Sequence, residues 1–187
     1  HLQDYRFPSQ SMDEDALQVV RRLQRFGYLG YFVGGCVRDI LLGAQPKDFD
    51  IATSARPREV KQIFRTCRLI GRRFKLAHIH ISRDKILEVA TFRQKPSNEG
   101  LEEGLIIEDN EFGTAETDAY RRDFTINALF YDPMRHQLHD YCGGLKDIQE
   151  KRLRSIGDPV ERFREDPIRM LRAIKFAARL SLQFNPP

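Results

Sequence analysis

Cysteines and long apolar runs are both scarce in this sequence. Three cysteines, Cys36, Cys67 and Cys142, lie far apart in a chain of 187 residues. An odd number without paired spacing supports neither a disulfide framework nor a zinc site, so we expect reduced thiols. No apolar run approaches the roughly 20 residues that a membrane helix needs, and the N-terminal residues lack the apolar segment of a secretory signal. These absences predict a cytoplasmic protein without a membrane anchor.

The composition is that of a globular protein with a mild excess of basic charge. Hydrophobic residues make up 41% of the chain and charged residues 31%, which is enough apolar material for one good core, or for a domain and part of a second. The 31 lysines and arginines outnumber the 27 acidic residues. A basic balance is compatible with a nucleic acid or a nucleoside triphosphate as the partner.

Apolar periodicity predicts a mixed α/β domain over residues 1–150 and a helical region over 151–187. After the strand expected at 86–92 comes a polar, Glu- and Gly-rich stretch at 94–112, which we expect to be a mobile loop. In the second region, Asp158-Pro159 and Asp166-Pro167 resemble helix starts, and Ile168, Leu171, Ile174 and Ala178 form an apolar stripe. Helices are expected at 13–26, 37–42, 57–64, 118–127 and 145–150, and strands at 31–33, 48–52, 68–70, 76–81, 86–92, 129–131 and 137–141.

A Gly-Gly turn follows an apolar strand in the segment Tyr31–Asp39, which reads Tyr-Phe-Val-Gly-Gly-Cys-Val-Arg-Asp. Gly34 and Gly35 let the backbone approach a ligand closely, and the helix expected at 37–42 would direct its first amide groups toward an anion. Arg38 lies in the first turn of that helix. The segment therefore predicts a turn that holds the phosphates of a nucleotide.

Asp48 and Asp50 are two residues apart on the next expected strand. On a strand both carboxylates project from one face, while Phe49 and Ile51 point to the opposite face and into a core. An exposed strand edge would explain the pair alone, but the preceding Gly-Gly turn favours a site for divalent metal. Oxygen ligands beside a phosphate substrate favour Mg²⁺ over zinc.

Nucleotide transfer to a hydroxyl group uses two such ions roughly 3.5 to 4 Å apart, and a carboxylate on an adjacent strand usually completes the site. Two residues are candidates for that third carboxylate. Glu88 lies in the strand expected at 86–92, and Asp123 lies in the segment Arg121–Asn127. Sequence spacing leaves both possibilities open.

Two further motifs suit a nucleotide. The segment Arg121–Asn127, Arg-Arg-Asp-Phe-Thr-Ile-Asn, brings together two guanidinium groups and a carboxamide suited to a triphosphate and a ribose hydroxyl, although a charged helix face would also explain it. Asp166, Arg169 and Arg172 are three residues apart and share one helical face. A carboxylate beside an arginine can read the polar edge of adenine or cytosine and reject uracil and guanine. Local ion pairing is the alternative explanation.

In this order, the segments 34–39, 48–50, 121–127 and 165–172 resemble the family of class II tRNA nucleotidyltransferases and bacterial poly(A) polymerases. The resemblance covers nearly the whole chain. It implies a polymerase-β-like catalytic head at 1–150, with a mixed sheet flanked by helices, followed at 151–187 by the start of an all-α neck that recognises the base. It also implies RNA-binding body and tail domains that this sequence does not include.

The resemblance also implies a role for each motif residue. Asp48 and Asp50 would be catalytic and would bind the metal. Asp123 matches a position treated as part of the active site in the poly(A) branch, which favours it as the third catalytic carboxylate while Glu88 remains the alternative. The residues implied to contact the triphosphate or sugar are Gly34, Gly35, Arg38 and Arg122, and those implied to face the base are Asp166, Arg169 and Arg172.

The segment Leu69–Ile79 is similar to the stretch that distinguishes bacterial poly(A) polymerases from CCA-adding relatives. It favours template-independent transfer of AMP from ATP to an RNA 3′ hydroxyl, with release of pyrophosphate and two Mg²⁺ ions. ATP and RNA 3′ ends are then the expected partners, and DNA is not. The alternatives are a CCA-adding or A-adding tRNA nucleotidyltransferase and, from another class, a non-catalytic nucleotide- or RNA-binding module. The stretch at 94–112 is shorter than expected for the poly(A) branch.

Overall fold

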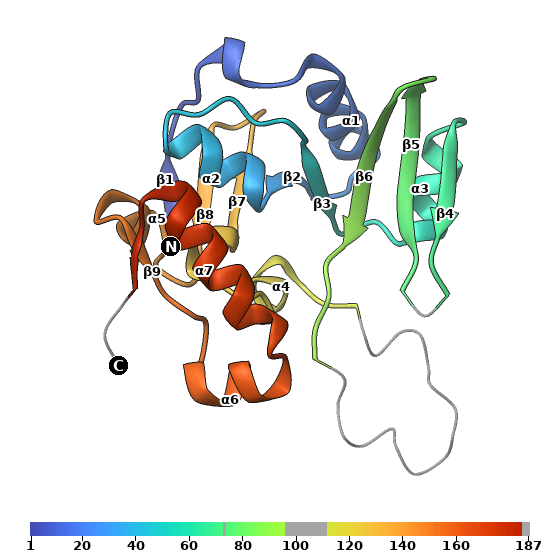
Figure 1. Cartoon of the computed structure of the whole chain (residues 1–187). Helices are drawn as coiled ribbons and strands as arrows, with labels where there is room; N and C mark the ends of the chain where they lie inside the picture. Colours follow the sequence, from blue (N-terminus) through green and yellow to red (C-terminus); the bar gives the residue numbers. More distant parts are fainter. Residues whose placement is uncertain (73, 96–111, 185–187) are drawn as a thin grey trace.

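One mixed sheet of eight strands organises the computed structural model, which describes residues 1–72, 74–95 and 112–184 (Figure 1). Across the sheet the strand order is β1-β8-β7-β2-β3-β6-β5-β4. Neighbouring strands are antiparallel except for β3 and β6, which are parallel. The strands are β1 (Leu2–Asp4), β2 (Gly30–Val33), β3 (Asp50–Thr53), β4 (Cys67–Ile70), β5 (Leu76–Ser82), β6 (Lys85–Thr91), β7 (Leu129–Asp132) and β8 (Gln137–Asp140).

Helices connect the strands of this sheet and continue beyond its last strand, and a short parallel pair of strands, β9 (Arg152–Leu153) and β10 (Gln183–Phe184), lies outside it. The helices are α1 (Glu14–Arg25), α2 (Gly35–Leu41), α3 (Pro57–Ile63), α4 (Ala115–Tyr120), α5 (Gly144–Gln149), α6 (Pro159–Glu165) and α7 (Ile168–Leu180), with single 3-10 turns η1 (Ser9–Ser11) and η4 (Thr125–Asn127). Among the described residues, no helix combines the length and the apolar composition that a membrane crossing requires.

Helix α1 forms as its sequence predicts. The Asp13 side chain caps its N-terminus by accepting a hydrogen bond from the Ala16 amide at 2.9 Å. Gly27 follows the end of the helix in the left-handed conformation, with φ of 87°, which glycine adopts without the steric cost that other residues have. Its buried positions have the helical spacing that places them on one face, and they are Ala16, Val19, Val20 and Leu23.

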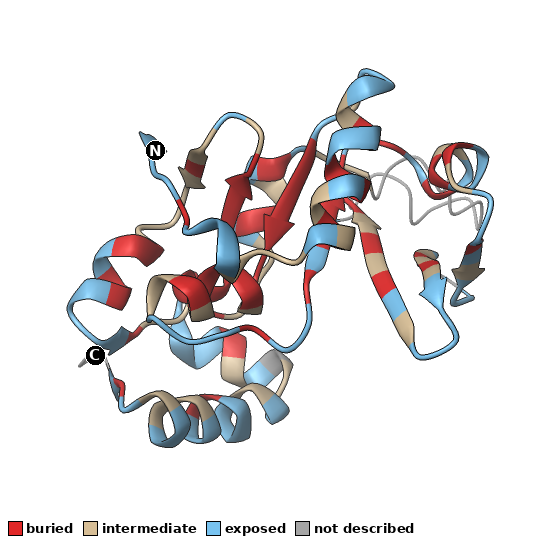
Figure 2. Ribbon diagram, turned by 90° about the horizontal axis from the view of Figure 1, so that it is seen from above, coloured by how far each residue is buried: buried red, intermediate tan, exposed pale blue. Residues whose placement is uncertain are grey.

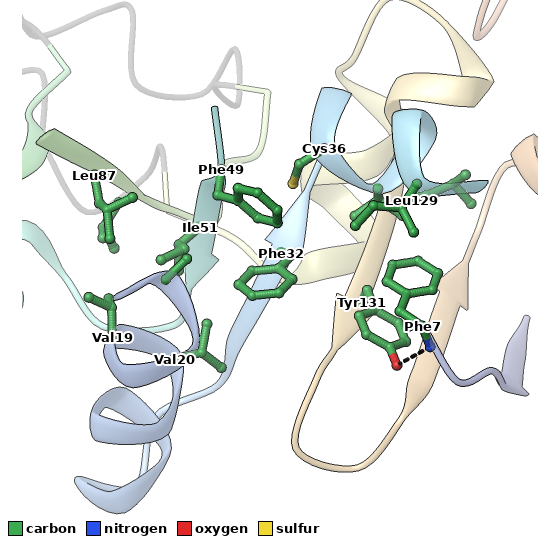
Figure 3. Packing of buried hydrophobic residues seen from close by; sticks show 14 of the residues in the cluster. Phe7, Val19, Val20, Phe32, Cys36, Phe49, Ile51, Leu87, Leu129 and Tyr131 are labelled. Carbon is green, nitrogen blue, oxygen red and sulfur yellow. Dashed lines mark hydrogen bonds between the residues drawn. The ribbon is translucent and has the colours of Figure 1, made fainter. Parts of the chain in front are cut away.

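The central strands are buried on both faces, which divides the core in two. Phe32, Ile51 and Tyr131 point to the face covered by α1, α2 and α3 (Figure 3). Tyr31 and Phe130 point to the other face, where α4 packs. Strands β2 and β7 are buried along their whole length and β3 at all but its first residue, Asp50, whereas burial alternates along the outer strands β5 and β6 (Figure 2). That alternation leaves one face of the outer strands open beside the central strands.

The helix expected at 118–127 is wrong beyond Tyr120. Helix α4 ends at Tyr120, and Phe124 is extended and forms a bridge with Ser155. The Thr125 amide donates to the Arg154 carbonyl at 3.1 Å, so pairing with a distant segment replaces the helical hydrogen bonds there. Local propensity is weak enough to be overridden by such tertiary contacts. Most of the loop expected at 94–112 falls outside the described residues.

Both helix starts expected in the second region are confirmed, but the apolar stripe of α7 faces outward. Asp158 accepts from the Val160 amide at 2.8 Å, and Asp166 accepts from the Ile168 amide at 3.0 Å. Ile168, Leu171 and Ile174 are 63%, 67% and 55% exposed. The contact of α7 with the rest of the structure is made instead by buried Ala173 and by partly buried Phe176, Ala177 and Leu180.

Candidate active site

The strand expected at 48–52 begins only at Asp50, so Asp48 and Phe49 precede it, but the expected alternation of exposed and buried side chains is confirmed. Asp48 and Asp50 are exposed, whereas Phe49 and Ile51 are buried. The Phe49 ring meets the Phe32 ring edge to face, with centroids 5.2 Å apart. Because the apolar side chains fix which way the strand faces, both carboxylates must point away from the helix-covered core.

Glu88 of β6 is the direct cross-strand neighbour of Asp50 in the parallel pair β3–β6. Asp50 has its pKa raised to about 6, chiefly because the surrounding protein desolvates its carboxyl group and secondly because the Glu88 carboxylate repels its charge; Asp48 adds a smaller repulsion. Arg122 acts in the opposite direction and lowers it. Negative charge thus accumulates at this point of the open face.

This excess of carboxylate charge is chemically suited to a hard divalent cation, which prefers oxygen ligands. Within the part of the chain that the structure describes, no three His, Cys, Asp or Glu side chains are arranged to hold a metal ion by themselves. A cation held by Asp48 and Asp50 would therefore take its other ligands from water and from the phosphates of a substrate. The donor set fits Mg²⁺ bound together with a nucleotide.

The Gly-Gly turn leads from β2 into α2 next to these carboxylates. Val33, the last residue of β2, is the cross-strand partner of Asp50. Gly34 has φ of 74°, a conformation that L side chains rarely adopt, and a Cβ built on it would lie 3.6 Å from the Arg122 guanidinium. A Cβ on Gly35 would lie 3.2 Å from the Arg38 guanidinium. The turn therefore passes close to two cationic side chains.

Arg38 lies in the last turn of the short helix α2, rather than in its first turn, and is 6% exposed. It donates to Asn127 Oδ1 at 2.7 Å and to Asp39 Oδ1 at 3.0 Å, and its guanidinium carbon is 5.1 Å from the centre of the Phe176 ring on α7. In this arrangement Arg38 joins α2 to η4 and α7. Its contact with a triphosphate stays a prediction.

Asp118 holds both arginines of the Arg-Arg-Asp motif, and sequence reasoning missed it. Its carboxylate is nearly inaccessible and accepts from Arg121 Nε and Nη2 at 3.0 and 2.8 Å, and from Arg122 Nε and Nη2 at 3.2 and 2.9 Å. Arg122 also lies over the Phe130 ring at 5.6 Å. The available signal was an acid three and four residues before two arginines, a spacing that pairs side chains on a helix.

Asp123 is directed toward α7. Its Oδ1 accepts from the Phe124 amide at 2.8 Å and from Asn127 Nδ2 at 3.2 Å, and its Oδ2 lies 3.1 Å from Arg172 Nη2. The carboxylate beside Asp50 across the strands is that of Glu88. The two candidates for the third carboxylate therefore have different surroundings. Asp123 forms an ion pair with Arg172 of α7, whereas Glu88 lies beside Asp50.

The remaining predicted residues lie at the start of α7. Asp166 precedes this helix and accepts from the Ile168 amide, and its Oδ2 lies 3.9 Å from Arg169 Nε, a long ion pair of the kind that sequence spacing allows. Arg172, one turn further along, is paired with Asp123 and has a side chain that is 51% exposed. Asp123 thus connects this group of residues to the Arg121–Asn127 segment.

Comparison with known proteins gives consistent matches. Residues 30–154 match the family described as the poly(A) polymerase head domain. Poly(A) polymerase I of Haemophilus influenzae is 54% identical over 92% of this chain and 40% of its own length, and a CCA-adding enzyme of Bacillus licheniformis is 38% identical over 91% and 42%. The solved Bacillus stearothermophilus CCA-adding enzyme in complex with CTP has a TM-score of 0.78 and 36% identity, covering 94% of this chain and 42% of that one. The chain spans about 40% of the length of these relatives.

The raised pKa of Asp50 predicts an acid limit for cation binding. In metal-free protein this carboxyl should be protonated below a pH of about 6, so that protons compete with the cation there. Substituting Glu88→Gln removes a repulsive charge and should move the Asp50 titration to lower pH. Carbon NMR of the Asp50 carboxyl, followed over pH in metal-free protein, measures this midpoint.

Glu161→Gln is the matched control for that titration, because Glu161 lies on α6, away from the carboxylate pair, and is exposed. Its midpoint for Asp50 should equal that of the unsubstituted protein. An Asp50 midpoint that stays in place or rises in the Glu88→Gln protein would contradict the electrostatic account.

The hydrogen bonds from Arg121 and Arg122 to the Asp118 carboxylate, here called the Asp118 clamp, predict that a small substitution at Asp118 lowers stability substantially. Asp118→Asn keeps the shape but removes the charge that four guanidinium hydrogen bonds share, so the free energy of unfolding should fall by about 2–3 kcal/mol. Denaturant unfolding monitored by circular dichroism measures the change. Asp84→Asn, in the exposed turn between β5 and β6, should alter it by less than about 0.5 kcal/mol. Equal stabilities for the two variants would refute the clamp.

Proposed function

Because the chain belongs to the family of poly(A) polymerase head domains, we propose that it is the catalytic head of an enzyme that transfers AMP from ATP to an RNA 3′ hydroxyl. Pyrophosphate is the second product. The observation that carries this proposal is the exposed pair Asp48 and Asp50, with Glu88 across the strands and Arg122 near enough to influence the charge of Asp50. Identity to a poly(A) polymerase I, higher than to a CCA-adding enzyme, supports adenylate as the transferred group.

In the proposed reaction the RNA hydroxyl attacks the α-phosphorus in line with the leaving pyrophosphate, and no side chain becomes covalently attached. Asp48 and Asp50 would hold divalent cations, which we propose are Mg²⁺. Bound cations of this kind lower the pKa of an attacking hydroxyl and neutralise the leaving group. Arg122, fixed by Asp118, would attract the triphosphate toward the Gly34 turn.

The remaining site residues belong to the same proposal. Gly34 and Gly35 would leave room for the phosphates, and Arg38 would contribute charge beneath the turn. Asp166 and Arg169 at the start of α7 would read the base, with Arg172 beside them. We assign the base-reading part to a helical neck at 151–187 and catalysis to a head at 1–150, and the family match over 30–154 supports this division.

RNA binding in the whole protein would rest mainly on segments beyond this chain, since the relatives are more than twice as long. ATP and RNA 3′ ends are the proposed partners, and a reaction that consumes them suits a cytoplasmic protein. A CCA-adding or A-adding tRNA nucleotidyltransferase is the second candidate, and the likeness to a CCA-adding enzyme solved with CTP favours it. A non-catalytic nucleotide-binding module is the third.

Loss of either exposed aspartate should abolish turnover without disturbing the fold. Asp48→Ala and Asp50→Ala should each reduce AMP incorporation by about 10³-fold or more, because each removes an anchor for the cations that stabilise the transition state. The measurement is label transfer from ATP to an oligoadenylate by the full-length protein, with unfolding curves as the check on folding. Asp4→Asn, an exposed aspartate on β1, should retain full activity. Appreciable turnover by Asp48→Ala would overturn the mechanism.

The choice between the enzyme candidates requires different primers. We expect the full-length protein with Mg²⁺ and labelled ATP to produce long ladders on oligoadenylate. Addition of two C residues and one A, confined to tRNA lacking its 3′ CCA, would instead establish the CCA-adding candidate. Tight ATP binding without metal-dependent turnover on either primer would support the non-catalytic module.

A further inference from the structure

A cleft lies between helix α1 and strand β5, on the sheet face that the helices cover. It has a volume of about 350 Å³. Val19 and Ile79 are buried at its base and Ile81 is partly exposed beside them. Figure 3 shows Val19 on the side of α1 that faces the sheet. We call this feature the α1 cleft.

Arginines form the α1 side of the cleft. Arg21, Arg22 and Arg25 all line it and all are exposed. Over the residues that the structure describes, no carboxylate forms an ion pair with any of the three, although the surface arginines Arg135, Arg152 and Arg172 each have one. The cleft therefore combines an aliphatic base with three guanidinium groups that have no acidic partner.

Arg22 is held in place before any partner arrives. Its Nε donates to the Ile63 carbonyl at 3.1 Å. Its guanidinium carbon lies 5.5 Å from the centre of the Phe26 ring and 5.8 Å from that of Phe64. A guanidinium fixed in this way loses less conformational freedom when it pairs with a carboxylate, which favours binding at this point.

We propose that the α1 cleft binds an acidic peptide segment of a partner protein, in which one apolar side chain is flanked by aspartates or glutamates. The volume lies at the lower end for ligand pockets and accommodates one or two aliphatic side chains. Carboxylates on either side of the apolar side chain would pair with the guanidinium groups of the cleft, because a planar guanidinium can donate two parallel hydrogen bonds to one carboxylate. Charge complementarity and the apolar base together select this occupant.

Nucleic acid fits the α1 cleft less well. Single-stranded RNA binds without base pairing by stacking its bases on aromatic rings. The buried lining residues Val19 and Ile79 are aliphatic, and the one aromatic ring that lines the cleft, Phe64, already has the Arg22 guanidinium over it. Asp50 and Glu88 also lie on the opposite pleat from Val89 and Ile79, which face the helices. A primer end at the carboxylates is thus on the other side of the sheet. The proposal does not rest on the proposed function.

Fluorescence anisotropy with the full-length protein tests the proposal. The probe is a short fluorescein-labelled peptide with one leucine between pairs of glutamates. The double variant Arg21→Glu with Arg25→Glu should weaken its binding by about tenfold or more, because charge reversal in such a contact replaces attraction with repulsion. A double variant of equal charge change, Arg6→Glu with Lys146→Glu, alters exposed residues on other elements and should bind as the unsubstituted protein does.

Two further measurements separate the apolar and acidic requirements. Replacing the leucine of the probe by serine should weaken binding by about threefold to tenfold, since the aliphatic base then lacks its partner. Oligoadenylate of equal charge should not displace the probe. Absence of saturable binding, equal loss in both double variants, or displacement by oligoadenylate would each overturn the proposal. RNA extension activity, retained by the Arg21/Arg25 variant, verifies that it is folded.

Discussion

Alternation of exposed and buried side chains from Asp48 to Ile51, where the chain enters β3, is the constraint on which the carboxylate pair depends. Phe49 and Ile51 are committed to the core by Phe32 and by the helices behind it, and a strand has only two faces. The two aspartates between and before them must then meet on the open side. A shift of one residue would bury both carboxylates and expose both apolar side chains. Hydrophobic packing therefore determines which face of the sheet the carboxylates occupy, although the apolar side chains take no part in the chemistry.

A second chain of contacts connects this core to α7. Arg38 donates to Asn127, Asn127 donates to Asp123, and Asp123 pairs with Arg172. Phe176 adds an aromatic contact, with its ring 6.0 Å from that of Phe124. Arg38, Asn127 and Asp123 are largely enclosed, where a missing partner is costly, whereas the Arg172 side chain is 51% exposed. The network therefore adds polar contacts to the small apolar contact of α7. The outward apolar stripe of α7 takes no part in this attachment.

Sequence patterns gave a correct account of what is local. Helix α1, the core strands and the facing of the carboxylates all follow from periodicity and capping, and each was confirmed. Pairing between distant segments could not be predicted from sequence patterns. The Phe124–Ser155 bridge replaced an expected helix, and Glu88 is the neighbour of Asp50 only because β6 pairs with β3. The burial of Arg38 was missed for the same reason, since its partners come from η4 and α7. Motif residues identify a region, but only the assembled sheet decides which of them touch.

The parallel pairing of β3 with β6 also has a bearing on how the protein folds. Strands β4, β5 and β6 are joined by short turns and can pair with one another locally, whereas β6 reaches β3 only after the chain has crossed over through α3 and two intervening strands. Closing so long a loop is slow, because its entropy is lost before the contact forms. The contact between Asp50 and Glu88 therefore requires the closure of a much longer loop than the pairing of β4, β5 and β6 with one another.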